Sequence, residues 1–462
     1  MQRLVMVLKN VPSPRRQLSA ALLLLAGCSG HHQTHPAPAT VTYFHDIKPI
    51  VDANCVPCHQ PGNIAPFALT EPTQITAHQT TMVDDVAQRQ MPPWPAAKDG
   101  PAYSNDRSLP PAEALLFQKW AEQGFALGDP KHTGLPLTEP GSQPTTGMSR
   151  VDLSLKMLSP FTPTVSPDEY RCFVLDWPET GKQFITGFGV TPGNRNIVHH
   201  LIAFVAPPSA AADLAKLTNG DPSQGYECFG GPMVDQAAWL GVWAPGTQGS
   251  DYPAGTGVAI PPGSKIILQI HYNLQNLLRS VSSQGQGDHN DPSDPSDPSD
   301  QTSAEFELAA SVPTEAFILP WNNPIWPTDR TSMLIPAGSP DTVHSFSADP
   351  TVFFGGKSLH ILGAFDHMHQ LGASSVLKID RPNASDVIVD VPHWDFHWQL
   401  QYWLKQPLVL NAGDQLSIEC HWDNSAANQP VIDGIQQKPR DVTWGNGSTD
   451  EMCFGTFYVT ME

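Results

Sequence analysis

Residues 196–204 read Asn-Ile-Val-His-His-Leu-Ile-Ala-Phe, an apolar run interrupted by one pair of adjacent histidines. Its β-branched and aromatic side chains favour a strand, and Gly/Pro turns separate it from its neighbours. From about residue 150 onward the sequence contains other short runs of the same kind, and it therefore predicts all-β structure in two blocks. These other runs are 170–177, 264–272, 387–391, 408–419 and 454–461.

The composition limits the classes of function. The chain has 462 residues, of which 40% are hydrophobic and 15% charged, so a globular protein of about three domains is expected. With 25 basic and 45 acidic residues, its formal net charge is −20. This charge excludes nucleic acid as a partner on electrostatic grounds. Between the two β blocks, residues 291–300 repeat Asp-Pro-Ser, a low-complexity spacer that is expected not to pack.

The N-terminus has the pattern of an export signal. Basic residues precede the apolar run 18–26, which is too short to span a bilayer, and Leu-Ala-Gly-Cys follows at 25–28. This tetrapeptide resembles the bacterial lipobox, which predicts a lipoprotein signal peptide over 1–27, lipidation of Cys28 and a tether over 28–40. The alternative is ordinary cleavage, with Cys28 an incidental thiol. Either way we expect a disulfide-permissive compartment, and with lipidation a bacterial cell envelope protein on a membrane, facing the periplasm or the exterior.

Residues 41–129 have helical rather than strand periodicity. Beyond them, residues 130–149 are rich in Pro, Gly, Thr and Ser and predict a linker. The helices are expected at 43–51, 75–90 and 111–125.

A cysteine motif lies in this helical segment. Cys55 and Cys58 are three residues apart and His59 follows directly, which is the attachment pattern of a c-type haem. The pattern predicts two thioether bonds to one haem c, with His59 as proximal iron ligand. A redox-active dithiol is the alternative, but it has no use for His59 and expects a βαβ context.

The distal haem ligand is less defined by the sequence. Met91 stands before two prolines and offers a thioether on a stiff turn, and His78 and Met82 are alternatives in the same interval. Residues 41–129 resemble the small cytochrome c domains that are fused to other modules in bacterial envelope proteins.

Five histidines form the second constellation. His367 and His369 are two residues apart, so on a regular strand they share a face and can chelate one metal ion. The adjacent His199 and His200 diverge on a regular strand, and can bind one ion only where the strand ends or bulges. His271 lies in a third strand-like run.

On these residues, 150–462 resembles the copper type II, ascorbate-dependent monooxygenases, the family of peptidylglycine α-hydroxylating monooxygenase and dopamine β-monooxygenase. The resemblance implies two copper ions in two β-sandwich domains, here 150–310 and 311–462. Two imidazoles with a thioether favour copper over zinc. The implied ligands are His199, His200 and His271 for one copper, and His367, His369 and Met452 for the other.

The resemblance also implies two disulfides, Cys172 with Cys228 and Cys420 with Cys453. Gln269 matches a family position near the first copper. In the family, the His/Met site is catalytic and activates O2 for hydroxylation of a substrate C–H bond, whereas the all-histidine site stores the second electron.

The expected fold class is therefore multidomain, with a small all-α cytochrome c domain followed by two all-β, jelly-roll-like sandwich domains. The expected function is that of a copper-dependent monooxygenase that hydroxylates a small organic substrate. Electrons would come through the fused haem from an ascorbate-like reductant or a redox protein. The alternative is an envelope electron-transfer or copper-binding protein without hydroxylase activity.

Two departures from the family bear on the substrate. Peptide-hydroxylating members hold the substrate carboxylate with a basic residue before the His-x-His pair and with polar groups after the ligand methionine. This chain has Phe365 and Phe454 at these places, so a neutral or apolar substrate is expected. Other histidines and aromatic residues are interpreted as structural or surface groups and as sandwich core. They are His344, His360, His393, His397 and His421, and Trp394, Trp398, Tyr402 and Trp403.

Overall fold

The computed structural model describes residues 40–61, 65–134, 147–244, 247, 249–274, 298–432 and 435–461. The predicted signal peptide, Cys28, all but the last residue of the tether and most of the linker lie outside the described residues. The described chain from Val41 onward groups into one compact unit. Among its residues, no helix is long and apolar enough to cross a membrane.

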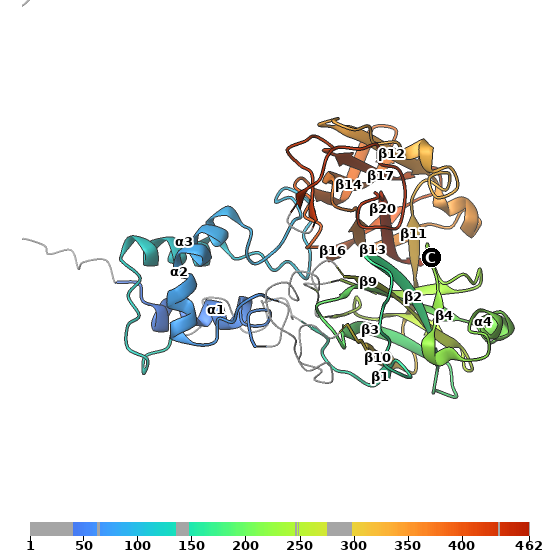
Figure 1. The fold of residues 1–462 in the computed structure, drawn as a ribbon, viewed down its shortest axis with the longest axis horizontal. Coiled ribbons are helices and arrows are strands. Elements are labelled where there is room, and N and C mark those ends of the chain that lie inside the picture. Colours follow the sequence, from blue (N-terminus) through green and yellow to red (C-terminus); the bar gives the residue numbers. More distant parts are fainter. Residues whose placement is uncertain are drawn as a thin grey trace, which may run out of the picture. The chain divides into compact units, whose positions relative to one another are not determined.

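Helices are concentrated near the N-terminal end of this unit (Figure 1). The predicted helices are present with shifted ends, because α2 begins at a capping box formed by Glu71 and Gln74, and α3 begins at a proline. Their apolar sides enclose a small core that contains Tyr43, Phe117 and Trp120. The α-helices are α1 (Lys48–Asn54), α2 (Pro72–Gln88), α3 (Pro111–Glu122) and α4 (Ala211–Leu217), and a π-helical turn (Tyr43–Ile47) precedes α1.

The expected fold class is wrong in its all-α part. The structure is 37% strand and 17% helix, and in its described residues the helical segment does not separate from the β structure as a unit of its own. Fewer than half of residues 41–129 lie in helices. The physical reason lies after α2, where Pro92, Pro93 and Pro95 prevent further helix. The chain continues instead as an irregular segment with turns that packs on the β structure.

This irregular segment, residues 94–105, is hydrogen-bonded to two strands, β15 (Ala384–Val391) and β16 (Gln401–Leu410). The Ala97 amide donates to the Asp390 carbonyl at 2.8 Å, and the Ser104 amide donates to the Trp403 carbonyl at 2.8 Å. Tyr103 is buried and its hydroxyl donates to the Ile388 carbonyl at 2.9 Å. The segment therefore extends the β structure beyond β16.

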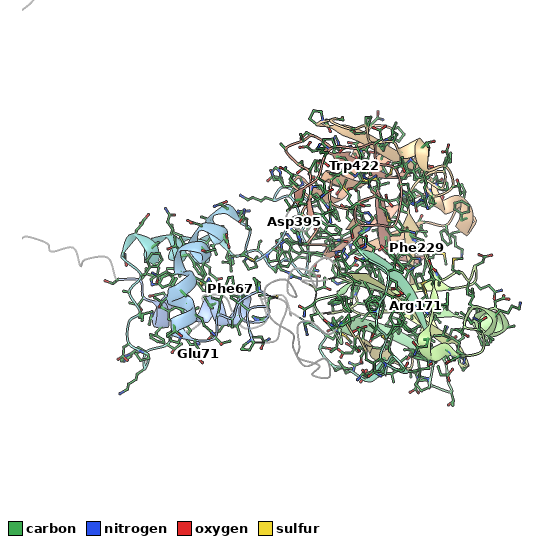
Figure 2. All side chains as sticks on the ribbon, in the orientation of Figure 1. Phe67, Glu71, Arg171, Phe229, Asp395 and Trp422 are labelled. Atoms are coloured by element: carbon green, nitrogen blue, oxygen red, sulfur yellow. A yellow bond between two sulfur atoms is a disulfide. The ribbon has the colours of Figure 1, made fainter. Side chains whose placement is uncertain are left out.

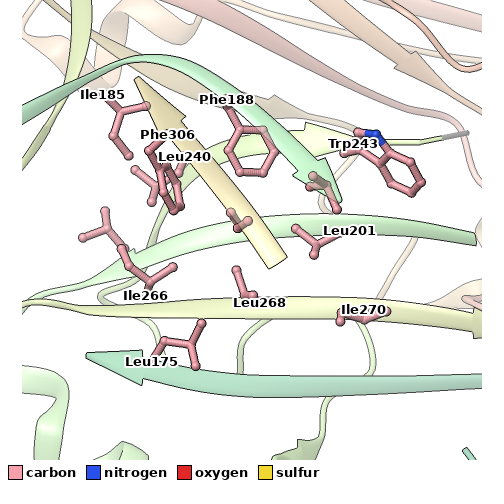
Figure 3. Close-up of a cluster of buried hydrophobic side chains, with 14 of the residues drawn as sticks. Leu175, Ile185, Phe188, Leu201, Leu240, Trp243, Ile266, Leu268, Ile270 and Phe306 are labelled. Carbon is pink, nitrogen blue, oxygen red and sulfur yellow. The ribbon is translucent and has the colours of Figure 1, made fainter. Parts of the chain in front are cut away.

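The first block of strands contains a five-stranded sheet in the order β5-β2-β9-β4-β6. It packs on β10, β3 and β8 of a larger sheet through apolar side chains that include Leu268, Ile270 and Phe306 (Figure 3). The five strands are β5 (Tyr226–Glu227), β2 (Asp168–Asp176), β9 (Lys265–Asn273), β4 (Val198–Ala206) and β6 (Ala238–Trp243).

The second block contains a four-stranded sheet in the order β12-β17-β14-β15, which packs on β13 and β20 of the larger sheet. Leu377, Ile418 and Phe457 are among the buried side chains of this core, and so is Tyr402, as expected. Besides β15, the four-stranded sheet consists of β12 (Thr342–Ala348), β17 (Gln415–Trp422) and β14 (Gly372–Arg381). A separate hairpin consists of β18 (Val431–Ile432) and β19 (Ile435–Gln436).

The larger sheet has nine strands and is shared by both blocks. Its order is β1-β10-β3-β8-β11-β20-β13-β16, with β7 paired to β3. The two halves meet where β8 and β11 pair in parallel, with Thr256 opposite Thr314. The strands are β1 (Leu153–Lys156), β10 (Ser303–Ala309), β3 (Gln183–Thr191), β7 (Ser250–Asp251), β8 (Thr256–Ile260), β11 (Thr314–Trp321), β20 (Phe454–Met461), β13 (Leu359–His367) and β16.

The acidic spacer is packed at its C-terminal end. Most of it lies outside the described residues, but Asp300 is 1% exposed and forms a β-bridge with Phe161. Its carboxylate accepts hydrogen bonds from Tyr272 at 2.9 Å and from Thr302 at 2.9 Å. The expectation that the repeat does not pack is therefore wrong for its last residue.

Candidate metal centre

Three histidines converge where β4 pairs with β9. His200 lies directly opposite His271, and the register shifts between Val198 and His200, so His199 occupies a β-bulge. The bulge turns both adjacent histidines to one side. The Nδ1 atom of His200 lies 3.1 Å from Nδ1 of His199 and 3.4 Å from Nδ1 of His271. One ligand nitrogen from each ring lies within 4.8 Å of the others, a spacing that one metal ion can bridge.

Asp168 fixes the tautomer of His271. Its Oδ1 lies 2.8 Å from Nε2 of His271, and a carboxylate only accepts, so Nε2 carries the proton and Nδ1 keeps its lone pair. Burial alone would raise the pKa of Asp168, but hydrogen bonds from His271 and Ser448 outweigh it and hold this pKa well below its ordinary value. The Tyr170 ring stacks on the His271 ring, with the centroids 4.2 Å apart.

The second pair of histidines lies at the end of β13. Nδ1 of His367 lies 2.6 Å from Oε1 of Gln399. The Gln399 amide nitrogen donates to the Phe396 carbonyl, and this bond fixes which end of the Gln399 side chain faces His367. His367 therefore donates through Nδ1. His369 also donates through Nδ1, to the Asp450 carbonyl at 3.1 Å. Both rings keep Nε2 as the free lone pair, and burial lowers the pKa of His367 to about 4, so it is neutral.

Met452 lies close in the chain to this pair's partner strand. The antiparallel register of β13 and β20 ends with His367 opposite Phe454, and Met452 stands two residues before Phe454. The adjacent Glu451 is buried and accepts from the amides of His369 at 2.9 Å and Leu371 at 2.6 Å. These bonds tie the two ligand-bearing segments together.

The two clusters are neighbours. The ring centroids of His200 and His367 are 5.9 Å apart, and Phe396 contacts rings of both clusters. Phe396 belongs to the loop 392–400 between β15 and β16, in which Figure 2 labels Asp395. In the same loop, the Trp394 indole donates to the His369 carbonyl at 3.0 Å. One loop therefore touches both clusters.

Both expected disulfides are present in the structure. Cys172 on β2 is bonded to Cys228, and Cys420 on β17 is bonded to Cys453, the residue after Met452. Gln269 lies two residues before His271 on β9, where its amide donates to the Cys228 carbonyl at 2.7 Å. Each bridge thus fastens a segment next to one of the histidine clusters.

A cavity of about 740 Å³ adjoins the first cluster. Its wall includes Cys55, Cys58 and His59 from the helical segment and, from the β structure, His199 and Phe396. Much of the remaining wall is apolar. It includes Phe67, Leu69, Val86, Pro92 and Phe117.

The cysteine motif follows α1 and lies in the wall of this cavity. Neither Cys55 nor Cys58 takes part in a disulfide with another described cysteine. Nδ1 of His59 donates to the Phe67 carbonyl at 3.0 Å, which leaves Nε2 as a lone pair. Burial, assisted by Cys58 and Asp52, raises the pKa of Cys55 to about 12. Reactive dithiols need a lowered thiol pKa, so this environment argues against the dithiol alternative.

The candidates for the distal position differ in placement. Met82 and Met91 both line the cavity. His78 is stacked on Phe67, with centroids 3.8 Å apart, and Phe67 in turn contacts His59 at 4.7 Å. Phe67 therefore contacts both His78 and His59.

The two positions that depart from the family carry aromatic side chains in different surroundings. Phe365 is 5% exposed, and Phe454 stacks on Trp239 with centroids 5.6 Å apart. Phe365 also lines a small cavity whose wall includes Arg107. Among the aromatic residues expected in the core, Trp403 is buried, whereas Trp398 lines the cavity.

Sequence reasoning missed the groups that orient the ligands. Asp168, Glu451 and Gln399 are each far from their histidine partners in the sequence, and none stands in a periodic pattern. The only available signal was the position of Glu451 beside Met452 and Cys453.

Comparison with known families agrees with this geometry. The N-terminal domain of the copper type II ascorbate-dependent monooxygenases matches residues 155–279, and the C-terminal domain matches residues 331–461. Together the matches cover more than half of the chain. The chain belongs to this family, and it is an oxidoreductase, a copper-dependent monooxygenase. The family uses O2, a substrate and an ascorbate-like reductant.

Other comparisons add little. No curated protein matches the chain. An allantoicase structure is 9% identical over 61% of this chain and 74% of its own, with a TM-score of 0.13. A Paenibacillus xanthan lyase is 11% identical over 70% of this chain and 27% of its own, also with a TM-score of 0.13. Likenesses this weak carry no argument about fold or function.

Proposed function

We propose that this protein hydroxylates a C–H bond of a small organic substrate with O2, using two copper ions. His199, His200 and His271 would hold the copper that stores an electron. The observation that carries the proposal is the convergence of their three Nδ1 atoms beside His367, whose Nε2 is also free to bind a metal. The second copper would be held by His367, His369 and Met452.

The donor atoms fit copper. Three neutral imidazoles suit copper or zinc, whereas two imidazoles with a thioether favour copper, which then supplies one-electron redox chemistry with O2. The protein contributes orientation: Asp168 holds His271, Gln399 holds His367, and a backbone carbonyl holds His369. Phe396 covers one face of the His199 ring.

We further propose that electrons are supplied through a c-type haem attached to Cys55 and Cys58, with His59 as ligand. Support comes from the cavity of about 740 Å³, whose wall includes all three residues and also His199. A haem is a one-electron carrier, and its apolar ring suits a wall of this composition. Met91 and Met82 are the residues in this wall that offer a thioether as the distal ligand.

The substrate is proposed to be neutral or apolar. Phe365 and Phe454 stand where peptide-hydroxylating relatives bind a carboxylate, and the ring of Phe454 stacks on Trp239. A peptide with a free C-terminal carboxylate is therefore disfavoured.

For localisation we propose the bacterial cell envelope, with the chain anchored by lipid on Cys28 and facing the periplasm or the exterior. The two disulfides support an oxidising compartment. Labelling cells with a clickable fatty acid tests the anchor, because Cys28→Ala must abolish labelling of the mature protein.

The function is tested by giving the copper-loaded, reduced protein a panel of neutral aromatic and aliphatic compounds and matched carboxylates in isotopically labelled O2. Mass analysis should find a product that carries one labelled oxygen atom, with neutral compounds preferred. His369→Ala is the control that should yield no product. Oxygen consumption without a hydroxylated product from any compound would favour an electron-transfer protein.

A further inference from the structure

Asp168 contacts both halves of the molecule. Its side chain is 8% exposed at the start of β2, and its Oδ1 accepts from His271 of the first cluster. Oδ1 also accepts from the Ser448 hydroxyl at 2.7 Å, and Oδ2 accepts from the Ser448 amide at 3.0 Å. Ser448 is completely buried and lies four residues before Met452.

Asn273 and Tyr170 make further contacts between the same two segments. Asn273, which pairs with Asp168 across β2 and β9, donates to its Oδ1 at 3.0 Å and to the Ser448 hydroxyl oxygen at 3.0 Å. Tyr170 shares a strand face with Asp168, and its hydroxyl donates to the Asn446 carbonyl at 2.8 Å while its ring stacks on His271. The segment 446–448 is therefore held on β2 by side chains that also hold the first cluster.

The far end of this segment is fixed to the second block. Glu451 binds the backbone of His369 and Leu371, and Cys453 is bonded to Cys420. The segment from 446 to 453 thus runs from β2 of the first block to the Met452 side of the second cluster.

We propose that Asp168 is a positioning residue that sets the spacing of the two metal sites, by anchoring the Met452 segment to the same carboxylate that orients His271. This inference rests on the proposed function for the identity of the ligands. A carboxylate is needed because both of its oxygens accept, and four donors converge on it. An electron-storing site and an O2 site must keep a defined separation, and hydrogen bonds from outside the ligand set supply such restraint.

Asp168→Asn separates this role from simple packing because it keeps the size of the side chain. The asparagine side chain has one accepting oxygen, so its NH2 group would face either the Ser448 amide or the Nε2–H of His271. Both of these groups are donors, so one of the two hydrogen bonds would be lost. Ser448→Ala removes the hydroxyl contact but keeps the amide, and Asp176→Asn, at the exposed end of the same strand, is the matched control.

Dipolar broadening and the half-field transition in the continuous-wave electron paramagnetic resonance spectrum of the two-copper, oxidised protein report the spacing, because the ring centroids of His200 and His367 are only 5.9 Å apart. We expect Asp168→Asn to lengthen and broaden the copper–copper distance distribution with copper content retained. Ser448→Ala should broaden it less, and Asp176→Asn should leave it as in the wild type. An unchanged distribution in Asp168→Asn overturns the inference.

Hydrogen exchange of the copper-free protein tests the anchor independently of metal. Exchange at the Ser448 amide should rise about tenfold or more in Asp168→Asn, because a hydrogen bond to a carboxylate is lost. Exchange equal to that of Asp176→Asn would overturn the inference. If the wild type fails to bind two coppers, the proposed function is wrong, and this second measurement still decides whether Asp168 anchors the segment.

Discussion

Phe396 stacks on His199, with the ring centroids 4.7 Å apart and the ring planes 20° from parallel. The same ring approaches His369 edge-on, at 6.1 Å and 87°. A side chain from outside both ligand sets therefore occupies the space where the two clusters face each other.

Phe396→Ala should uncover one face of the His199 ring, because the stacked ring is removed and the cavity that both residues line is enlarged. With one equivalent of copper bound, we expect the Cu(II) electron paramagnetic resonance spectrum to show a changed ligand field. Phe396→Leu keeps apolar volume at the position and should retain a spectrum close to the wild type. Identical spectra for the alanine variant and the wild type would contradict this role.

Removing either disulfide should destabilise the protein by a similar amount. The bridges close loops with sequence separations of 56 and 33 residues. In the loop-entropy account each contributes about 4 kcal/mol to the free energy of unfolding. Denaturant unfolding of the double alanine variants, Cys172→Ala with Cys228→Ala and Cys420→Ala with Cys453→Ala, measures this loss.

The two bridges should differ in their effect on copper. Cys453 follows Met452 directly, so loss of the second bridge should also weaken copper binding at the His/Met site, measured by titration under native conditions. Loss of the first bridge should leave that affinity unchanged. Equal weakening by both variants would show that the effect is general destabilisation.

The ligand histidines could be proposed from the sequence because local rules apply to them. The ring centroids of His367 and His369 are 5.0 Å apart, as expected, although β13 ends at His367 and His369 follows it. The condition that His199 and His200 need a bulge is met by the register shift on β4. The groups that orient them depend on contacts between residues far apart in the sequence. Asp168 and Ser448 are 280 positions apart, and no periodicity links them.

The all-α domain was predicted wrongly for a related reason. Helical periodicity over 41–129 correctly indicated three helices, but it says nothing about what a helix-poor segment such as 94–105 will pack on. Tyr103 and Ala96 are buried in the core of the second block. That core also contains Tyr402, whose ring centroid lies 5.4 Å from that of Tyr103.

The cysteine motif predicts one covalent haem in the mature protein. Denaturing electrophoresis with haem staining should retain the signal in the wild type and lose most of it in Cys55→Ala with Cys58→Ala. For the distal ligand, Met91→Ala should change the reduced haem spectrum and lower its potential, because Met/His ligation raises it. His78→Ala should change neither. If Met82→Ala alone had this effect, the ligand would be Met82.

His421 should give the folded state a small pH dependence. Burial would lower its pKa, but hydrogen bonds to Asp341 at 2.9 Å and Glu419 at 3.4 Å outweigh burial and raise it. A raised folded-state pKa stabilises the fold fully below about pH 6.5, and this stabilisation is lost as the pH rises through the folded value. Its size should be about 1 kcal/mol or less, since the side chain is 31% exposed.

His421→Gln should therefore flatten the slope of unfolding free energy against pH above about pH 6.5, measured by urea denaturation of the copper-free protein. Asp341→Asn should flatten it in part. A steeper slope in His421→Gln would mean that burial, not the carboxylates, decides the pKa.

The two proposed copper sites should fail differently when a ligand changes. His200→Ala leaves the first set with two imidazoles, His199 and His271, so copper content should fall from about two toward about one per chain. Met452→His replaces a soft thioether by a harder nitrogen, so copper content should change less while Cu(I) becomes less favoured. Metal analysis and product formation, measured on the same samples, separate these effects. Product should fall in both variants, and full product formation in both would show that neither residue holds a catalytic metal.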